Sequence, residues 1–397
     1  MNSLTHVDLP ADVTDWRAWV DYGRRWSASG QRPPTATTTA PPALTLHLHA
    51  YREATPGPRW QALAEATWAA YERWFRARPA ATQPTYAECR DALHRHLPRL
   101  VPTWKRLVDL AAETTGASPE DAGRLLSLWR PTPFVTGCSQ IALVAPEPVL
   151  VRSYDYDPAL FEGVVASTDY SGARRVLGTS DCLWGLLDGM NEDGLAVSLT
   201  YGGRPGSGAG FGIPLVVRAL LEECGDIAEA VARVRTIPVA QAYNLTFLDA
   251  SGAAATVFVA PGEAPLVSPQ RIATNHRLDV IEYPAYAARV RSPERHDALR
   301  QLVGATPDTV VGAFLRAPIR STQFATGFGS LYAAAYRPRA GSLEYHWPGR
   351  TWTRRFDDPD DTITVEVPGA EVPRGCRGTR PDDGPRGCRA ARHHGRP

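Results

Sequence analysis

The chain has 397 residues, a length that predicts two or three structural units, or one large unit with extensions. Apolar residues make up 43% and charged residues 21% of it, which excludes a wholly disordered chain, a collagen and a coiled coil. The formal net charge of +1 provides no overall field to attract nucleic acid or an anionic membrane surface, so we expect neither partner.

The chain shows no targeting or metal-binding pattern. No secretory signal stands at its start and no window reaches 18 uncharged apolar residues, so we expect a cytoplasmic protein without a membrane span. Six cysteines are present and no two form a C-x-x-C pair, which argues against a zinc ribbon or a redox pair. We therefore expect free thiols, no metal and no cofactor.

The first third of the chain reads as an extension followed by helices. Residues 1–43 end in a Pro/Thr-rich linker at 31–42. In residues 44–137, large apolar side chains from Trp60 to Phe75 recur every three to five positions, which predicts one broad helical face. Further helices are expected over 86–112 and after Ser118, an N-cap followed by proline.

From residue 138 the pattern alternates between strands and helices. Turn signals join three hairpins, at 140–144 with 149–154, 183–190 with 195–201, and 243–248 with 254–260. Helices are expected at 213–224, 227–234, 284–303 and 307–315, and closing strands at 323–326, 331–337 and 343–347. This order predicts an α+β fold with antiparallel sheets and helices packed outside them. Residues 351–397 form a C-terminal extension, and we expect disorder from residue 373.

Cys138 is the sharpest candidate for chemistry, because it follows Gly137 where the helical segment ends and the first hairpin begins. A short hairpin brings Arg152 beside Cys138, and an adjacent guanidinium favours the nucleophilic thiolate. The alternative is that Cys138 is a small buried hydrophobe and that Arg152 and Asp155 form a solvated ion pair.

Four short motifs occur in order: Gly-Cys-Ser at 137–139, Arg-Ser-Tyr-Asp at 152–155, Asp-Gly-Met-Asn-Glu-Asp-Gly-Leu-Ala-Val at 188–197, and Ala-Thr-Asn-His at 273–276. Together they resemble the isopenicillin N acyltransferase family of N-terminal nucleophile (Ntn) hydrolases, with penicillin V acylases and bile salt hydrolases as more distant relatives. The resemblance covers about residues 45–350. It implies a four-layer αββα sandwich with a catalytic core at 138–350. It also implies self-cleavage between Gly137 and Cys138, after which residues 44–137, as the small subunit, stay associated with the large one.

The resemblance also implies the site residues. Cys138 is the nucleophile, Arg152 and Asp155 lie beside it, and Asn275 is the oxyanion-hole side chain. The remaining implied positions are Thr200 or Tyr201, as the backbone donor to the same hole, and Arg320, as a late active-site arginine.

These residue types can carry out the self-cleavage and acyl transfer that the resemblance implies. Cleavage would give Cys138 an α-amine whose reference pKa of about 7.7–8.0 suits a general base, so nucleophile and base belong to one residue. An acyl-Cys138 intermediate would pass its acyl group to water or to an amine. The expected substrate is a small acyl amide or acyl thioester, and the sequence leaves hydrolysis and transfer open.

Three alternatives remain at this stage. The chain could be a non-catalytic relative, a ligand-binding or interaction protein that keeps the fold but never self-cleaves. A Cys/His protease would use His276, which leaves the Gly-Cys junction and Arg152 unexplained. The glycine-rich run at 202–212 lacks the full dinucleotide fingerprint and the lysine of a phosphate-binding loop, so a loop at a pocket rim is the better interpretation.

Overall fold

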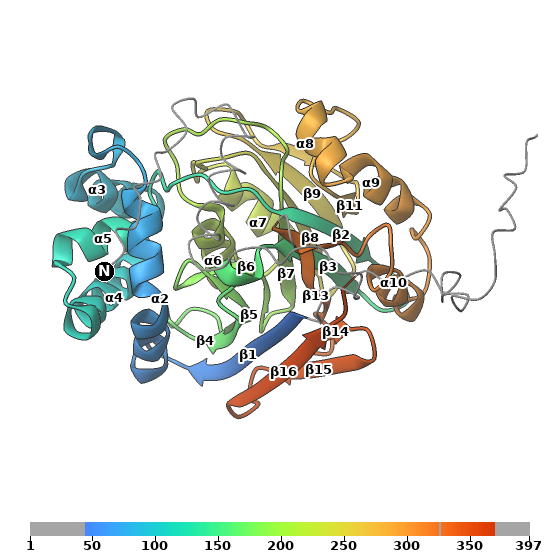
Figure 1. Ribbon diagram of the computed structural model, residues 1–397, viewed down its shortest axis with the longest axis horizontal. Helices are drawn as coiled ribbons and strands as arrows, with labels where there is room; N and C mark the ends of the chain where they lie inside the picture. The colour runs from blue at the N-terminus through green and yellow to red at the C-terminus, as the bar shows by residue number, and fades with distance from the viewer. Residues whose placement is uncertain (1–43, 325–326, 370–397) are drawn as a thin grey trace, which may run out of the picture.

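The computed structural model describes residues 44–324 and 327–369, which form two β-sheets with helices on their outer sides (Figure 1). The expected extension at 1–43 and the expected disordered tail from 373 lie outside the described residues. No described helix combines the length and the apolar character that a membrane crossing requires.

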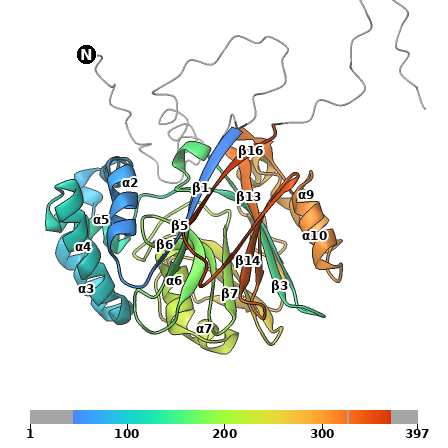
Figure 2. The same ribbon diagram turned by 90° about the horizontal axis from the view of Figure 1, so that it is seen from below.

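Four helices form the expected helical segment, at one end of the molecule (Figures 1 and 2). The bounds are α2 (Pro58–Arg76), α3 (Tyr86–His96), α4 (Val101–Thr115) and α5 (Pro119–Ser127), with short 3-10 turns η1 (Ala80–Thr82) and η2 (Pro98–Leu100) between them. The Ser118 hydroxyl accepts a hydrogen bond from the Asp121 N–H at 3.1 Å, which confirms the predicted N-cap.

The larger sheet has nine strands in the described residues, in the spatial order β10-β9-β8-β7-β6-β5-β4-β1-β16. Their bounds are β1 (Leu44–Glu53), β4 (Val164–Thr168), β5 (Val176–Asp181), β6 (Gly185–Asn191), β7 (Leu195–Tyr201), β8 (Tyr243–Asp249), β9 (Ala254–Val259), β10 (Leu266–Ser268) and β16 (Asp361–Val367). Every neighbouring pair is antiparallel except β1 with β4.

The smaller sheet has the order β11-β2-β3-β13-β14-β15, with β12 paired to β13. Its bounds are β2 (Gly137–Leu143), β3 (Val149–Tyr156), β11 (Ile272–Ala273), β12 (Thr322–Gln323), β13 (Phe328–Arg337), β14 (Ser342–Trp347) and β15 (Arg350–Arg355). A further 3-10 turn, η3 (Pro158–Leu160), follows β3. All described pairs in this sheet are antiparallel, so the predicted antiparallel sheets are confirmed.

Strand β1 differs from the expected helical character of residues 44–137, and β16 lies beyond the expected core boundary at 350. In β1, the buried Leu46, Leu48 and Ala50 alternate with the exposed His47 and His49, a half-buried strand pattern. This strand lies between β4 and β16, so both chain segments outside 138–350 contribute to the larger sheet.

The outer helices complete the layers. Helices α6 (Ile213–Glu223) and α7 (Ile227–Val234) lie on the larger sheet, and α8 (Pro284–Arg289), α9 (Ser292–Arg300) and α10 (Pro307–Phe314) lie beside the smaller one (Figure 1). Three hydrophobic clusters fill the spaces between these layers. The layer order is therefore helices, sheet, sheet, helices, as predicted.

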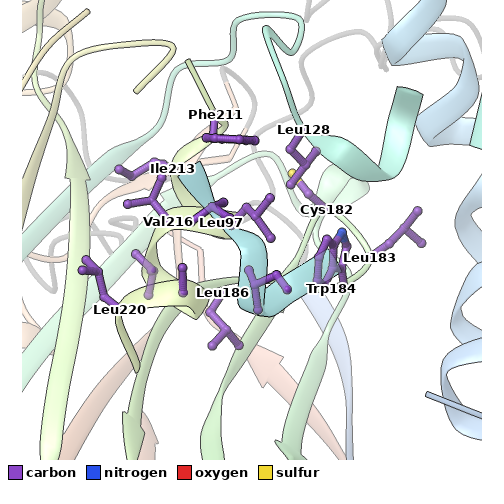
Figure 3. Packing of buried hydrophobic residues seen from close by; sticks show 14 of the residues in the cluster. Leu97, Leu128, Cys182, Leu183, Trp184, Leu186, Phe211, Ile213, Val216 and Leu220 are labelled. Atoms are coloured by element: carbon purple, nitrogen blue, oxygen red, sulfur yellow. The ribbon is translucent and has the colours of Figure 1, made fainter. Parts of the chain in front are cut away.

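The cluster between the larger sheet and its helices is the largest of the three. Figure 3 shows part of it, where Ile213, Val216 and Leu220 of α6 pack toward Leu186 of the sheet. Leu97 and Leu128 of the helical segment join the same cluster, so that segment and the rest of the protein share one core.

Strand alternation sets the direction of the side chains in the first hairpin. Ile141 of β2 and Val151 of β3 belong to the cluster beneath α9 and α10, whereas Cys138 and Tyr154 belong to the cluster between the sheets. Neighbouring residues of a strand point to opposite faces. The thiol of Cys138 therefore points between the two sheets, and the side chain of Asp155 points toward α9.

Candidate active site around Cys138

Cys138 lies at the start of β2 and is fully buried. The predicted hairpin is confirmed, with Cys138 opposite Tyr154 and Gln140 opposite Arg152. An N–H of the Arg152 guanidinium lies 3.3 Å from the Cys138 sulfur, so the predicted neighbourhood of these two side chains is confirmed.

Arg152 is itself buried and bonded on several sides. It donates to the carboxylate of Asp188, to the Tyr332 hydroxyl at 2.9 Å and to the Leu199 carbonyl at 3.2 Å. Its guanidinium carbon lies 5.1 Å from the centre of the Tyr154 ring. These contacts fix the guanidinium against the sulfur, and the sequence pattern did not predict Asp188 as its partner.

Asp188, on β6, balances the charge of Arg152 inside the protein. Its carboxylate accepts hydrogen bonds from the hydroxyls of Thr179 and Tyr332, each at 2.7 Å, and from Tyr336. A buried ion pair is tolerated when its remaining hydrogen-bonding positions are satisfied in this way. The motif at 188–197 that contains this aspartate predicts no role for it.

The pKa of the Cys138 thiol is raised, chiefly because burial disfavours the charged thiolate. The positive charge of Arg152 opposes this effect but does not overcome it. The sequence predicts only the effect of the guanidinium, which favours the thiolate. In the intact chain, burial therefore keeps the sulfur protonated until a proton acceptor is present.

Asn275 spans the peptide bond that the sequence analysis predicts to be cut. Its Oδ1 accepts a hydrogen bond from the Cys138 N–H at 3.0 Å, and its Nδ2 donates to the Thr136 carbonyl at 3.1 Å. The backbone N–H of Asn275 donates to the Ser292 hydroxyl at 2.7 Å, which fixes the loop after β11. The amide therefore touches the residues on both sides of Gly137.

Asp155 lies on the other side of β2, against Gly137. A Cβ atom on Gly137 would lie 3.1 Å from the Asp155 Cβ, which is closer than most such contacts. This lack of space accounts for a glycine here, although the backbone of Gly137 does not lie in the left-handed region. Asp155 accepts a hydrogen bond from the Ser330 hydroxyl at 2.5 Å. Burial raises its pKa to about 6, against the opposing charge of Arg295.

Arg295, on α9, is a buried site residue that sequence reasoning missed. It donates to Asn275 Oδ1 at 2.6 Å, to the Ser139 hydroxyl at 2.8 Å and to the Cys138 carbonyl. It also lies 3.7 Å from the Asp155 carboxylate. One guanidinium therefore connects Cys138, Asn275 and Asp155, three residues that the sequence analysis had placed in the site.

The remaining predicted positions lie in different surroundings. The Thr200 hydroxyl donates to the Thr274 carbonyl at 2.7 Å, and the Tyr201 carbonyl accepts from Asn275 Nδ2 at 3.1 Å. The contact of Tyr201 with Asn275 is thus made through an acceptor, and the backbone-donor role of Thr200 or Tyr201 stays a prediction. Arg320 donates to the Pro368 carbonyl, and its charge is one of those that oppose the rise in the pKa of Asp155 caused by burial.

The ring of His276 contacts the hydroxyl groups of two neighbouring residues. Its Nδ1 lies 2.8 Å from the Ser292 hydroxyl and 3.3 Å from that of Thr274. Burial, followed by the charges of His296 and Arg295, lowers its pKa to about 4, so the ring is neutral at physiological pH. These contacts support a role in positioning the loop that carries Asn275.

The glycine-rich run at 202–212 forms a loop between β7 and α6. At Gly203, with φ of +71°, an added Cβ would lie 2.2 Å from the Asn275 carbonyl oxygen, and at Gly210 it would lie 2.2 Å from the Val239 backbone. Close backbone packing therefore accounts for both glycines. Within 44–324 and 327–369, histidine, cysteine and carboxylate side chains form no group of three or more that could hold a metal ion.

A small pocket borders Gly137. Its lining includes Gly137, Asp155, Arg295, Ser321 and Phe328. The pocket therefore reaches the face of β2 that carries Asp155, whereas the sulfur lies on the opposite face.

The sequence model of the acyl-coenzyme A:6-aminopenicillanic acid acyl-transferase family matches residues 144–352, just over half of the chain. The chain belongs to this family. The match includes three of the four motifs, so the resemblance to this family is confirmed, and the αββα layers agree with those that the resemblance implies. The acyl-transferase family is one of enzymes that act on acyl groups. No curated protein matches the sequence.

Solved structures similar to this family member share little sequence with it. A conjugated bile acid hydrolase from Clostridium perfringens is 11% identical, with a TM-score of 0.40 over 58% of this chain and 97% of the other. An N-acylethanolamine-hydrolyzing acid amidase ortholog from Caenorhabditis elegans is 15% identical, with a TM-score of 0.38 over 51% and 93%. A penicillin V acylase from Agrobacterium tumefaciens is 14% identical, with a TM-score of 0.36 over 53% and 82%.

Proposed function

We propose that the protein cleaves itself between Gly137 and Cys138 and then hydrolyses or transfers acyl groups of small acyl amides or thioesters through an acyl-Cys138 intermediate. The observation that carries this proposal is the position of the Asn275 amide. It contacts Thr136 and Cys138, on both sides of Gly137, while Arg152 contacts the sulfur.

The self-cleavage step transfers an acyl group within the chain. The Cys138 sulfur attacks the Gly137 carbonyl carbon, the bond from that carbon to the Cys138 nitrogen breaks, and the nitrogen takes the thiol proton. The products are a thioester on Cys138 and a free α-amine on the same residue. Water then attacks the thioester, which leaves a Gly137 carboxylate and restores the thiol.

Cleavage also frees the groups that the second reaction needs. The new α-amine can take the thiol proton, which the raised pKa of Cys138 otherwise retains. Once the segment that ends at Gly137 moves away, Asn275 Nδ2 no longer donates to the Thr136 carbonyl. That N–H then becomes available to the oxyanion of a tetrahedral intermediate.

Arg295 acts in this scheme as a positioning residue. It donates to Asn275 Oδ1, so the amide cannot rotate by half a turn without placing its N–H groups against a guanidinium. It also binds the Cys138 carbonyl, which anchors the start of β2 on the residue that carries the nucleophile. We propose that Arg295 holds the Asn275 amide and Cys138 in the same relative position before and after cleavage.

The two products of self-cleavage would stay together, because the N-terminal fragment supplies an internal strand. β1 pairs with β4 over five residues and with β16 over seven, and the helices after β1 bury Trp60 and Trp104 in the shared core. Its removal would expose two strand edges and apolar surface of the other fragment.

Intact-mass analysis of the purified protein tests the proposal. We expect two species of 137 and 260 residues that co-elute in native size-exclusion chromatography and separate only in denaturant. A chain that stays whole after prolonged incubation would instead support the non-catalytic relative, and fragments that separate under native conditions would contradict the role of β1.

The rate of self-cleavage should rise with pH through about 6, where Asp155 ionises. The ionised carboxylate pairs with Arg295 and can hold the new α-ammonium, and the protonated form does neither well. Timed samples of freshly produced precursor, stopped at a series of pH values, would give the profile by electrophoresis. The rise with pH should be absent after an Asp155→Asn exchange.

Acid unfolding does not explain a cleavage rate that falls below about pH 6. The pKa of Asp155 is higher in the folded protein than its ordinary value of 3.8, so the folded state binds this proton more tightly. Its contribution to stability is therefore fully present below about 4 and is lost as pH rises through about 6. A thermal melting temperature that falls together with the cleavage rate on acidification would contradict the prediction.

A further inference from the structure

A tyrosine of α8 reaches the same carbonyl group as Asn275. The Tyr286 hydroxyl donates a hydrogen bond to the Thr136 carbonyl oxygen at 2.7 Å, and Asn275 Nδ2 donates to that oxygen at 3.1 Å. Two side chains from different elements therefore converge on one oxygen atom, two residues before the nucleophile. Donors at about 2.7–3.1 Å from a single oxygen are the arrangement that stabilises the oxyanion of a tetrahedral intermediate.

The hydrogen bonds of Asn275 indicate where the oxyanion of a substrate lies. A carboxamide nitrogen carries two hydrogen atoms. On Nδ2, the Tyr201 carbonyl accepts one of them and the Thr136 carbonyl accepts the other, each at 3.1 Å. In the proposed function the segment that ends at Gly137 leaves, whereas Tyr201 stays because it belongs to β7. The oxyanion therefore takes the place of the Thr136 oxygen, within reach of the Tyr286 hydroxyl.

The Tyr286 side chain is held in this position by its surroundings. It is fully buried, and its ring packs edge-on against the Tyr201 ring at 5.4 Å between ring centres. Arg295, which donates to Asn275 Oδ1, also donates to the Val290 carbonyl at 2.8 Å, just after α8. One guanidinium thus holds both the amide and the end of the helix that carries the hydroxyl. A donor that is fixed before the reaction stabilises developing charge without reorganisation.

The Tyr286 hydroxyl keeps its proton, as a hydrogen-bond donor must. Burial raises the pKa of Tyr286 well above its usual range, and the charges of Tyr201 and Cys138 add to the rise. The effect of Cys138 also shows that the hydroxyl lies close enough to the reacting sulfur to respond to its charge. Tyr286 is therefore a donor and not a base at physiological pH.

Neighbouring tyrosines differ from Tyr286 in what their hydroxyls bind. The Tyr332 hydroxyl donates to the Asp188 carboxylate. The Tyr201 hydroxyl donates to the Arg204 carbonyl. Both of these acceptors belong to parts of the protein that stay in place after self-cleavage, whereas the acceptor of Tyr286 belongs to the segment that leaves. Self-cleavage therefore makes the Tyr286 hydroxyl available to a substrate.

We propose that Tyr286 is a second catalytic side chain of the oxyanion hole, beside Asn275, and that the Thr136 carbonyl fills this hole in the uncleaved chain. This inference rests on the proposed acyl transfer through Cys138. It implies that the uncleaved chain cannot stabilise the oxyanion of an external substrate, because its own carbonyl occupies both donors. Self-cleavage forms its oxyanion on a different residue, Gly137, so we expect it to depend less on the hydroxyl.

Two reagents that modify the same sulfur test the inference on the purified, self-cleaved enzyme. With 4-nitrophenyl acetate, the acetyl group passes to Cys138 through an oxyanion intermediate, 4-nitrophenolate leaves and the α-amine takes the thiol proton. Iodoacetamide alkylates the same sulfur by displacing iodide, and no oxyanion forms. We expect Tyr286→Phe to slow acylation by about 10- to 100-fold and to leave the alkylation rate within about twofold of the wild-type rate. Release of nitrophenolate and the mass of the fragment that begins at Cys138 measure the two rates.

Tyr170→Phe is the matched control, because it removes another buried tyrosine hydroxyl, which donates to Glu53 at 3.1 Å. Both of its rates should equal those of the wild-type enzyme. Tyr286→Leu removes the ring together with the hydroxyl and should show the same fall in the ratio of acylation to alkylation as Tyr286→Phe. If one of the two Tyr286 variants fails to fold, the other still decides.

The results separate this inference from the proposed function. Equal acylation rates in the wild-type enzyme and Tyr286→Phe overturn the inference and leave the acyl-Cys138 intermediate intact. An equal loss of acylation and alkylation also overturns it, because the hydroxyl would then act on the nucleophile. Folded Tyr286 variants that never cleave themselves overturn it as well, since the hydroxyl would then be required before the hole is vacated. A wild-type chain that never cleaves itself, or that is cleaved but never acylated, overturns both proposals.

Discussion

Cys138→Ala is expected to leave the chain whole at 397 residues, whereas the wild-type protein yields two fragments. The substitution removes the sulfur that attacks the Gly137 carbonyl. Two hydroxyl groups lie nearby, that of Thr136 at 3.5 Å from the sulfur and that of Tyr286, which donates to the Thr136 carbonyl at 2.7 Å, and we expect neither to replace the thiol. Intact-mass spectrometry after days of incubation measures the result directly.

The matched control for this variant is Cys89→Ala. Cys89 is a buried thiol of α3, far from the cleavage site in the chain, and has burial comparable to that of Cys138. It should process at the wild-type rate, which shows that loss of a buried sulfur alone does not stop the reaction. Processing by Cys138→Ala, or a wild-type Cys138 that never appears as a new N-terminus, would refute the nucleophile.

The hairpin that places Arg152 beside Cys138 could be predicted because all of its determinants are local. The two residues are 14 positions apart, the strands are apolar, and a short turn joins them. Alternation in each strand then decides which side chains share a face. The same local reasoning predicted the pairs β6 with β7 and β8 with β9, and the helices α6 and α7.

Elements that depend on distant partners were harder to predict. β1 pairs with β16 across more than 300 residues, and nothing within its own ten residues indicates a sheet in which β4 is the other neighbour. β5 is buried on both faces yet contains Gly178, Thr179, Ser180 and Asp181, so it lacks the apolar alternation of a typical strand. Its polar side chains make sense only with Asp188 and Glu162 in place.

Arg295 illustrates the same limit within the site. Helix α9 carries Glu294, Arg295, His296 and Asp297 in succession, and the structure buries Arg295 and His296 while Glu294 stays largely outside. The sequence does not show which of these four neighbouring residues points into the protein. The burial of Arg295 depends on the acceptor atoms of Asn275 and Cys138, which are distant in the sequence. The raised pKa of Cys138 could not be predicted for the same reason, because it depends on burial by residues outside the hairpin.

Asn275→Asp is expected to slow turnover of an acyl amide by about 10² to 10³-fold, with a smaller change in KM. The exchange keeps the shape and the Oδ1 that accepts from the Cys138 N–H, but it replaces the Nδ2 donor by an acceptor oxygen. A carboxylate there would repel the oxyanion that the amide stabilises. It would also pair with Arg295, which now donates to Oδ1, so the fold should survive.

Steady-state kinetics on a processed sample, with the melting temperature measured alongside, checks this expectation. Because Asn275 also contacts Thr136 before cleavage, the variant should cleave itself more slowly than the wild-type protein. A long incubation would then supply the mature enzyme for the kinetic measurement. Asn191→Asp is the matched control, since Asn191 is a buried asparagine that also donates through Nδ2 to carbonyls, but at the end of β6. If Asn275→Asp kept wild-type kcat, or if Asn191→Asp lost as much, the oxyanion role of Asn275 would be wrong, and stabilisation of the transition state would have to come from the Arg152 side of the sulfur.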